Sequence, residues 1–329
     1  MGSLGRMTFA RLSGRTTLPA TGALLAAALL ALLTLGPARG DARRTRVAVG
    51  VGDQSAAMFS NPYFRALKVR KARYFVRWDA LHRPADRAQL DAWLAAARAA
   101  RVRPFVHVST NDLRPKHAPL LSTRRYRREV GRLVAHLRAH RVRDVGVWNE
   151  ANHKSQPTWR SPARAAAYYR QMRSLCRRCS IVGLDVLDQA GVERYIRRFF
   201  AALPPSLRHR RIVVGIHNYS DTNRLRSRGT AAIIRTVRRY DRRARFWLTE
   251  TGGVVNFGRS FPCDTGRAAS RTAYMFRLAR RYDRQVERLY AYNFYGAGCQ
   301  GFDAGLVEAD GTPRPAYGVF RSKLRSFIR

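Results

Sequence analysis

The chain is poor in several residue types that carry specific chemistry, and each shortage excludes a class of protein. Its 329 residues include only four cysteines, five lysines and six glutamates. It has no Gly-x-Ser-x-Gly motif of a serine hydrolase, no His-Glu-x-x-His motif of a zinc protease and no glycine-rich phosphate loop. Apart from a general bias toward Arg and Ala, it lacks low-complexity segments, repeats and Pro/Ser/Gly-rich linkers, so we expect a single domain.

Acidic residues are scarce, and the formal net charge is +42. A hydrophobic content of 46% nevertheless indicates a packed core and argues against a disordered tail. The excess charge comes almost entirely from arginines scattered over every helix-like segment, which favours a biased surface composition over a nucleic-acid-binding stripe. We therefore expect no specific nucleic-acid partner, although a positive field attracts anionic polymers or membranes.

The N-terminal segment 1–40 has the pattern of an export signal. Three arginines precede the apolar run 22–36, and the small residues Ala38 and Gly40 offer a cleavage point. The apolar run is shorter than the roughly 20 residues that span a bilayer, which disfavours the alternative of an uncleaved anchor. The segment predicts a secreted or cell-envelope protein, with no stable membrane partner unless it stays uncleaved.

Four cysteines fit an oxidising compartment. Cys176 and Cys179 are close enough for a local bridge at a helix end, and Cys263 with Cys299 could join two late loops. A Cys-x-x-Cys also binds zinc or does redox work, but a structural zinc site would need a second pair at similar spacing. We expect two disulfides, and we predict no metal and no cofactor.

Past residue 45, short β-branched or aromatic runs alternate with longer stretches of helical spacing. The eight strand-like runs are 46–51, 72–78, 102–108, 144–149, 180–186, 211–219, 245–249 and 288–295. The helix-like stretches are 62–71, 86–100, 123–141, 162–176, 190–202, 230–241, 265–283 and 315–328. Eight such units over residues 45–329 predict an α/β protein with a single (β/α)8 TIM barrel, and a doubly wound open sheet is the alternative.

Two of the six glutamates, Glu150 and Glu250, close strand-like apolar runs, whereas the other four fall in helix-like stretches or a late loop. Two carboxylates at the mouth of a β/α scaffold suit chemistry on a glycosidic bond. One donates a proton while the other attacks or stabilises the positive carbon. Glu150 and Glu250 are therefore the candidate catalytic residues.

Other polar and aromatic residues also gather at the predicted strand ends, where barrel active sites form. An isolated histidine in such a place is more often structural than catalytic. Polar groups at seven strand ends together, however, indicate a binding site. The candidate substrate-binding residues are Arg77, Trp78, His107, Asn149, His217, Tyr219, Asn293 and Tyr295.

Trp148-Asn149-Glu150 at the fourth predicted strand, together with Glu250 at the seventh, resembles clan A of the glycoside hydrolases. The resemblance covers the whole barrel. It implies that Glu150 is the general acid/base and Glu250 the nucleophile, with Asn149 bonded to the sugar 2-hydroxyl. It also implies that Arg77 steadies the nucleophile, and that His217 or Tyr219 orients it.

The eighth strand departs from that pattern, because clan members often carry a sugar-stacking Trp there and this chain has Tyr292-Asn293-Phe294-Tyr295-Gly296. Phe257 and Phe261 could supply further aromatic surface in the loop after the seventh strand.

The prediction is a secreted, monomeric, retaining glycosidase that cleaves O-glycosidic bonds of a poly- or oligosaccharide. The alternatives are a carbohydrate-binding barrel without catalysis and a basic interaction protein for anionic envelope polymers.

Overall fold

The computed structural model describes residues 45–110, 118–208 and 210–328, which form one compact unit. The predicted export signal at 1–40 lies outside the described residues. Within the described part of the chain, no helix combines the length and the apolar character needed to cross a membrane.

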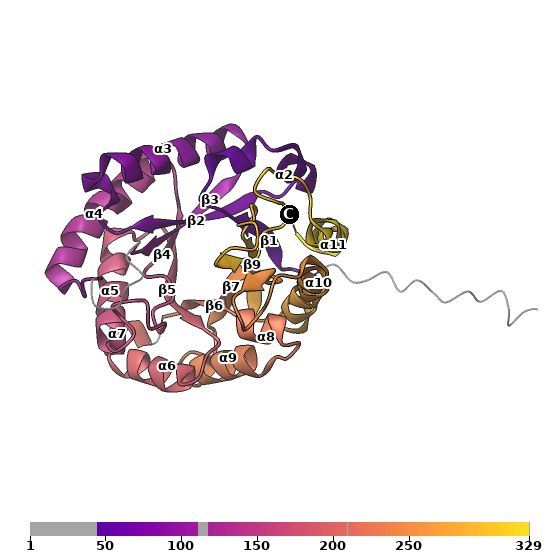
Figure 1. Cartoon of the computed structure of the whole chain (residues 1–329). Helices are drawn as coiled ribbons and strands as arrows, with labels where there is room; N and C mark the ends of the chain where they lie inside the picture. The colour runs from indigo at the N-terminus through magenta and orange to yellow at the C-terminus, as the bar shows by residue number, and fades with distance from the viewer. Residues whose placement is uncertain (1–44, 111–117, 209, 329) are drawn as a thin grey trace, which may run out of the picture. The chain divides into compact units, whose positions relative to one another are not determined.

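Eight parallel strands form a closed barrel, in which each strand pairs with the next and the last pairs with the first (Figure 1). The barrel strands are β1 (Ala48–Gly52), β2 (Lys71–Arg77), β3 (Arg103–Ser109), β4 (Asp144–Gly146), β5 (Ser180–Leu187), β6 (Val213–His217), β7 (Arg245–Thr251) and β9 (Val286–Tyr292). This closure confirms the predicted single-domain (β/α)8 barrel and excludes the doubly wound open sheet, which has two edges.

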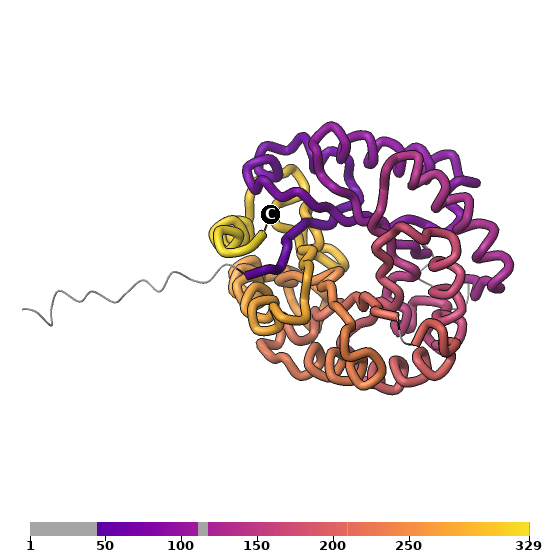
Figure 2. The backbone as a smooth tube through the Cα atoms, turned by 180° about the vertical axis from the view of Figure 1, so that it is seen from behind, coloured from indigo at the N-terminus to yellow at the C-terminus, as the bar shows by residue number. Residues whose placement is uncertain are grey.

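Helices surround the barrel as an outer ring, which Figure 2 shows from behind. The helices of this ring are α2 (Pro62–Leu67), α3 (Pro84–Ala99), α4 (Thr123–Ala139), α5 (Pro162–Leu175), α6 (Val192–Ala201), α9 (Arg228–Tyr240), α10 (Thr265–Arg281) and α11 (Pro315–Lys323). Four of them begin with proline, a residue whose fixed φ and missing N–H suit the first helical position. Two shorter helices, α7 (Pro205–Arg208) and α8 (Tyr219–Asn223), lie in loops.

Several strands end earlier than the sequence predicts. The fourth strand was expected over 144–149, but β4 ends at Gly146 and only single backbone bonds continue along it, from Val147 to Val182 and from Asn149 to Val108. The predicted strand 288–295 likewise ends at Tyr292. In both places the apolar pattern continues into a buried loop, which hydrophobicity alone does not distinguish from a strand.

Side chains fill the inside of the barrel. Phe105, Val182, Trp247 and Tyr290 form a separate buried cluster, with the Phe105 ring 5.3 Å from that of Trp247. Gly146 is required beside this cluster, because a Cβ there would lie 2.0 Å from the His107 ring. The barrel interior is therefore closed by packed side chains below the carboxyl ends of the strands.

The two ends of the described barrel meet at the amino end of β1. Ile328 forms a parallel bridge with Ala48, and its backbone N–H donates to the carbonyl of Val47. Thr45 donates to the carbonyl of Ser326 in the same place. The last residues of the chain therefore pair with the first residues of the barrel.

Both expected disulfides are present. Cys176 pairs with Cys179 at the end of α5, and Cys263 pairs with Cys299, so no cysteine is free. As a disulfide, Cys176 and Cys179 offer no thiolates to zinc.

Candidate active site

A pocket of about 860 Å³ opens at the carboxyl ends of the strands. Five of the predicted site residues line it: Arg77, Asn149, Glu150, Tyr219 and Glu250. Its volume lies in the range of about 300–1,000 Å³ that is usual for small-molecule sites. The strand-end rule therefore locates the pocket correctly.

Glu250 lies near the end of β7, where a network of donors holds its carboxylate. Nη1 of Arg73 donates to Oε2 at 2.7 Å, and the hydroxyl of Tyr219 donates to Oε1 at 3.3 Å. Arg73 is fully buried and also donates to Oδ1 of Asn149. Burial, helped by the charge of Glu250, raises the pKa of Tyr219 well above 10, so the phenol stays a donor. One carboxylate orientation is thus fixed beside a positive charge.

Glu150 follows the short strand β4 in a left-handed backbone conformation, with φ of 48°. For a non-glycine residue this region costs free energy, and such outliers concentrate at functional sites. The conformation is held because the N–H of Glu150 donates to Oδ2 of Asp185 at 3.0 Å and the N–H of Ala151 donates to the carbonyl of Asp185. The turn carries the Glu150 side chain into the pocket, where 19% of it is exposed.

His217, at the end of β6, lies between three carboxylates. Its Nε2 is 2.9 Å from Oδ2 of Asp185, and its Nδ1 is 3.1 Å from Oε1 of Glu150 and 3.6 Å from Oε2 of Glu250. Burial by itself would lower the pKa of His217, but the charges of Asp185 and Glu250 outweigh it and raise the pKa to about 10. The imidazole is therefore a cation at neutral pH, which donates from Nδ1 to Glu150 and forms an ion pair with Asp185 on its Nε2 side.

The two glutamates are close together. One carboxylate oxygen of Glu150, one of Glu250 and a ring nitrogen of His217 all lie within 4.8 Å of one another. These three atoms could geometrically hold a divalent cation. The raised pKa of His217 and the ion pair of Glu250 with Arg73 fit a network of hydrogen bonds better, because a metal needs a neutral imidazole.

The expected role of Arg77 requires correction. The guanidinium that contacts Glu250 belongs to Arg73, whereas Arg77 pairs with Asp79 and lines the rim of the pocket. Arg73 and Arg77 are four residues apart on β2, so their side chains point to the same face of the strand. The earlier residue lies deeper in the barrel and reaches Glu250, while Arg77 at the strand end meets the loop.

Five predicted binding residues do not line the pocket among the residues that the structure describes: Trp78, His107, His217, Asn293 and Tyr295. His217 is fully buried and lies beneath the pocket, among the carboxylates described above. The Trp78 ring is buried under the guanidinium of Arg125. His107 is fully buried beside Phe105, and burial lowers its pKa to about 3. Asn293 donates to the carbonyl of Tyr295. These contacts give each of the other four residues a structural role.

The candidate residues chosen from the sequence leave out several residues that lie at the site. Asp185 is buried, and His217 holds its pKa below the usual range against the effect of burial. His153 lies with Nδ1 3.8 Å from Oε2 of Glu150. Tyr292, the last residue of β9, lines the pocket where clan members often carry a tryptophan. The spacing Glu150-x-x-His153 was the one available signal for His153.

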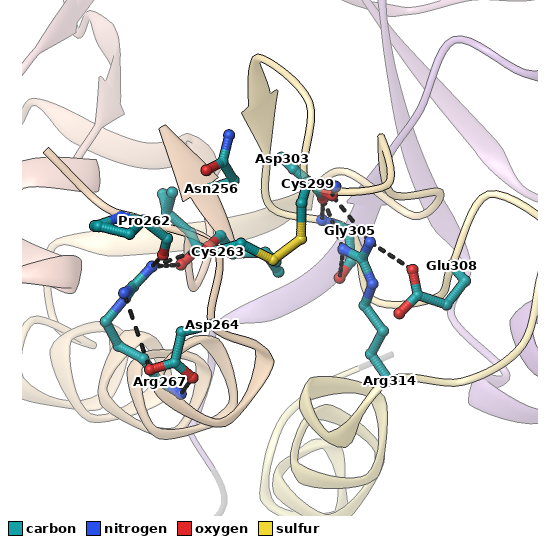
Figure 3. The surroundings of a disulfide bond; sticks show 12 residues. Asn256, Pro262, Cys263, Asp264, Arg267, Cys299, Asp303, Gly305, Glu308 and Arg314 are labelled. Atoms are coloured by element: carbon teal, nitrogen blue, oxygen red, sulfur yellow. Dashed lines mark hydrogen bonds and ion pairs between the residues drawn. A yellow bond between two sulfur atoms is a disulfide. The ribbon is translucent and has the colours of Figure 1, made fainter. Parts of the chain in front are cut away.

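Two disulfide-linked loops, after β7 and after β9, form one wall of the pocket. The two-residue strands β8 (Asn256–Phe257) and β10 (Phe302–Asp303) pair antiparallel, and the Cys263–Cys299 bridge joins their loops (Figure 3). Phe257, Phe261 and Phe302 from these loops line the pocket, as predicted for the first two. The buried ion pair of Arg314 with Asp303 fixes β10 from below.

A second, basic pocket of about 700 Å³ adjoins the first and shares His153 and Gln189 with it. It is lined by Asn152, His153, Lys154, Trp159, Arg160, Pro162, Gln189, Ala190, Gly191, Arg194, Tyr195 and Arg198. None of these described lining residues is acidic. The pocket next to Glu150 therefore has a basic lining.

Comparison with known proteins by sequence finds no relatives. No protein-family model matches the chain, and no curated protein is significantly similar to it.

Comparison with solved structures finds many barrels of similar fold. A glucosidase from Croceicoccus marinus matches with a TM-score of 0.61 and 14% identity over 88% of this chain and 69% of that chain. A xylanase from Paenibacillus barcinonensis matches with a TM-score of 0.59 and 10% identity over 86% and 99%. A β-1,4-mannanase of family GH113 matches with a TM-score of 0.56 and 12% identity over 86% and 99%. At these identities the similarity shows a shared fold, which is the barrel that the resemblance to clan A predicts.

Proposed function

We propose that this protein is a retaining glycoside hydrolase. The observation that carries the proposal is the approach of Glu150 and Glu250 to within 4.8 Å, oxygen to oxygen, in a pocket at the ends of β4 and β7. Retaining enzymes hold their two carboxyl groups about 5–5.5 Å apart, whereas inverting enzymes leave about 6.5–9.5 Å for a water molecule. The short separation supports direct attack by a carboxylate.

Glu250 is the nucleophile in this proposal. Only 9% of its side chain is exposed, and Arg73 and Tyr219 hold it in one orientation. In the first step an oxygen of Glu250 bonds to the anomeric carbon while the glycosidic C–O bond breaks. The orientation supplied by Arg73 and Tyr219 lowers the entropic cost of reaching that geometry.

Glu150 is the general acid and then the general base. Its side chain is more exposed than that of Glu250. This exposure suits its role, because the general acid/base must contact both the leaving oxygen and a water molecule. Its Oε1 accepts a hydrogen bond from His217, which leaves Oε2 to carry the proton. Glu150 gives this proton to the leaving oxygen, and later takes one from the water that attacks the anomeric carbon and releases Glu250.

The lining of the pocket suits a sugar. Phe75, Tyr292 and Phe302 offer aromatic surface, while Arg77 and Asn149 offer polar groups for hydroxyls. The three neighbours named above are a glucosidase, a xylanase and a β-1,4-mannanase by title. They support carbohydrate as the substrate class, and Asn149 fits the position that bonds a sugar 2-hydroxyl.

The substrate of this enzyme carries acidic groups. The basic pocket presents Lys154, Arg194 and Arg198 next to the catalytic pocket, where a chain of sugars leaving the catalytic residues would pass. Carboxylates or sulfates on the glycan would neutralise this charge. The same pocket is what the alternative of a basic interaction protein would use, but the paired glutamates favour catalysis.

We also propose that the protein acts outside the cytoplasm. The two disulfides indicate an oxidising compartment, which agrees with the export signal expected at 1–40.

A panel of aryl glycosides and polysaccharides, incubated with the wild type and with Glu250→Ala, tests the function. We expect turnover by the wild type with retained anomeric configuration by NMR, and at least about a thousandfold loss in Glu250→Ala. Glu150→Ala should keep activity on substrates with good leaving groups and lose it on poor ones. Glu287→Gln, a glutamate at the start of β9, is the matched control and should behave as the wild type.

Two results would contradict this assignment. Turnover of no glycan by the wild type would leave the carbohydrate-binding barrel as the better account. Inverted products would remove the nucleophile role from Glu250.

A further inference from the structure

A second cluster of metal-binding side chains lies on the outer ring of helices. His136 and His140 are four residues apart at the end of α4, so both imidazoles lie on one side of the helix. Asp91 of α3 faces them. One donor atom from each of the three residues lies within 4.8 Å of the others.

The distances converge on a single oxygen. Nε2 of His136 is 2.6 Å from Oδ1 of Asp91, and Nε2 of His140 is 3.7 Å from the same atom. The two rings are 4.8 Å apart between centroids. The other oxygen of Asp91 is 3.7 Å from Nε of Arg87, so the carboxylate is held with Oδ1 toward the histidines.

The proposed hydrolase does not use this cluster, because none of the three residues lines the catalytic pocket. A hydrogen bond between His136 and Asp91 would account for that pair alone. That hydrogen bond does not account for the second imidazole, since Nε2 of His140 lies 3.7 Å from the same oxygen of Asp91.

We propose that Asp91, His136 and His140 bind a divalent transition-metal ion, with Zn²⁺ the best fit. Two imidazole nitrogens and one carboxylate oxygen are typical zinc ligands, at about 2.0–2.2 Å from the metal. In a tetrahedron of that size the ligand atoms are about 3.3 Å apart. The His140 contact, at 3.7 Å, is already close to this value, and the His136 contact, at 2.6 Å, needs to open by about 0.7 Å.

The surroundings allow that adjustment. The side chains of Asp91 and His140 are about one-third exposed, at 35% and 34%, so they can rotate without disturbing the core. Water completes the coordination at the open side. Arg87 then acts as the outer partner that orients the ligating carboxylate, as such partners do in metal sites. The metal links α3 to α4 and stabilises that part of the ring.

Titration calorimetry of the full chain with ZnCl₂ tests this site, on protein that carries no polyhistidine tag and has been stripped with a chelator. We expect one zinc ion per chain and a higher melting temperature with zinc. His140→Gln and Asp91→Asn should each weaken binding by at least about tenfold. Asp91 and His140 are partly exposed, so these variants are expected to fold, and His136→Gln provides a third.

Two matched controls separate this site from other histidines and acids. His82→Gln changes an exposed histidine next to α3 that pairs with Glu129, and it should bind zinc as the wild type does. Glu250→Gln removes the acidic member of the catalytic cluster and should also leave binding unchanged. Failure of the wild type to bind zinc would overturn the proposal. So would binding that survives in His140→Gln and Asp91→Asn, or that disappears in Glu250→Gln. The result is independent of whether the protein cleaves a glycan.

Discussion

At the scale of single residues, His217 connects Glu150 and Glu250, the two proposed catalytic glutamates, electrostatically. It is completely buried and touches Asp185 on one side and Glu150 and Glu250 on the other. Such a buried ring would be neutral in apolar surroundings. The surrounding carboxylates make it a cation, so the site places two positive groups, Arg73 and His217, among the three carboxyl groups of Asp185, Glu150 and Glu250.

The raised pKa of His217 predicts a pH dependence of stability. Its pKa is about 10 in the folded protein and near 6.5 in the unfolded chain, so the folded form retains a proton that the unfolded form has lost. This contribution is complete below pH 6.5, and it declines by about 1.4 kcal/mol per pH unit until it is lost near pH 10.

Urea unfolding of the wild type and His217→Gln between about pH 6 and pH 9 measures this effect. The wild type should lose stability relative to the variant as the pH rises, because glutamine does not titrate. Parallel curves for the two proteins would mean that His217 is neutral in the folded state.

At the scale of elements, the loops after β7 and β9 depend on a covalent bridge. The antiparallel pair of β8 and β10 has only two residues in each strand, which is too short to be stable alone. The Cys263–Cys299 bridge and the Arg314–Asp303 ion pair hold it against the barrel. The aromatic wall of the pocket therefore relies on this bridge.

Replacing Cys263 and Cys299 together by alanine should destabilise the fold and loosen the wall. The loop-closure entropy of the unfolded chain predicts that a bridge spanning 36 residues stabilises the fold by about 4 kcal/mol. A bridge spanning three residues stabilises it by about 2 kcal/mol. The Cys176→Ala/Cys179→Ala variant is thus the matched control. Guanidinium unfolding compares the two, and KM should rise only in the Cys263/Cys299 variant. An equal loss of stability in both would show that loop length does not set the effect.

The elements were predictable from the sequence because each barrel strand has a buried apolar run and each helix has an amphipathic period. Both glutamates could be assigned to strands four and seven for the same reason. Arg73 could not be identified, because it pairs with a residue 177 positions away and the stagger of the barrel decides which arginine of β2 reaches Glu250. The two-residue strands β8 and β10 carry no detectable period, so their pairing could not be predicted, whereas Phe257, Phe261 and the cysteine pair of the same wall could.

At the scale of the whole molecule, the charge of +42 gives the protein a positive field over most of its surface. The basic pocket concentrates part of that charge beside the catalytic glutamates. Field and pocket together would draw an acidic glycan toward the site, whereas a neutral one would arrive by diffusion alone.

Salt should therefore affect the two kinds of substrate differently. Raising NaCl from about 0.05 M to about 0.5 M should lower kcat/KM on a uronate-containing oligosaccharide roughly tenfold and leave a neutral aryl glycoside nearly unchanged. Arg198→Glu should reproduce the loss at low salt. Arg238→Glu, an exposed charge reversal on α9, is the matched control and should cause a smaller change. Equal salt dependence for both substrates would exclude a specific basic subsite for the acidic groups of the glycan.

The pairing of Ile328 with Ala48 has a practical consequence for handling the protein. It brings both ends of the described barrel to the amino end of β1, while the catalytic glutamates lie at the opposite, carboxyl ends of the strands. A bead, tag or fused partner attached at either end of the described barrel is thus joined at its base, away from the pocket. Immobilised in this way, the protein would present its pocket outward to polymers too large to diffuse into a matrix.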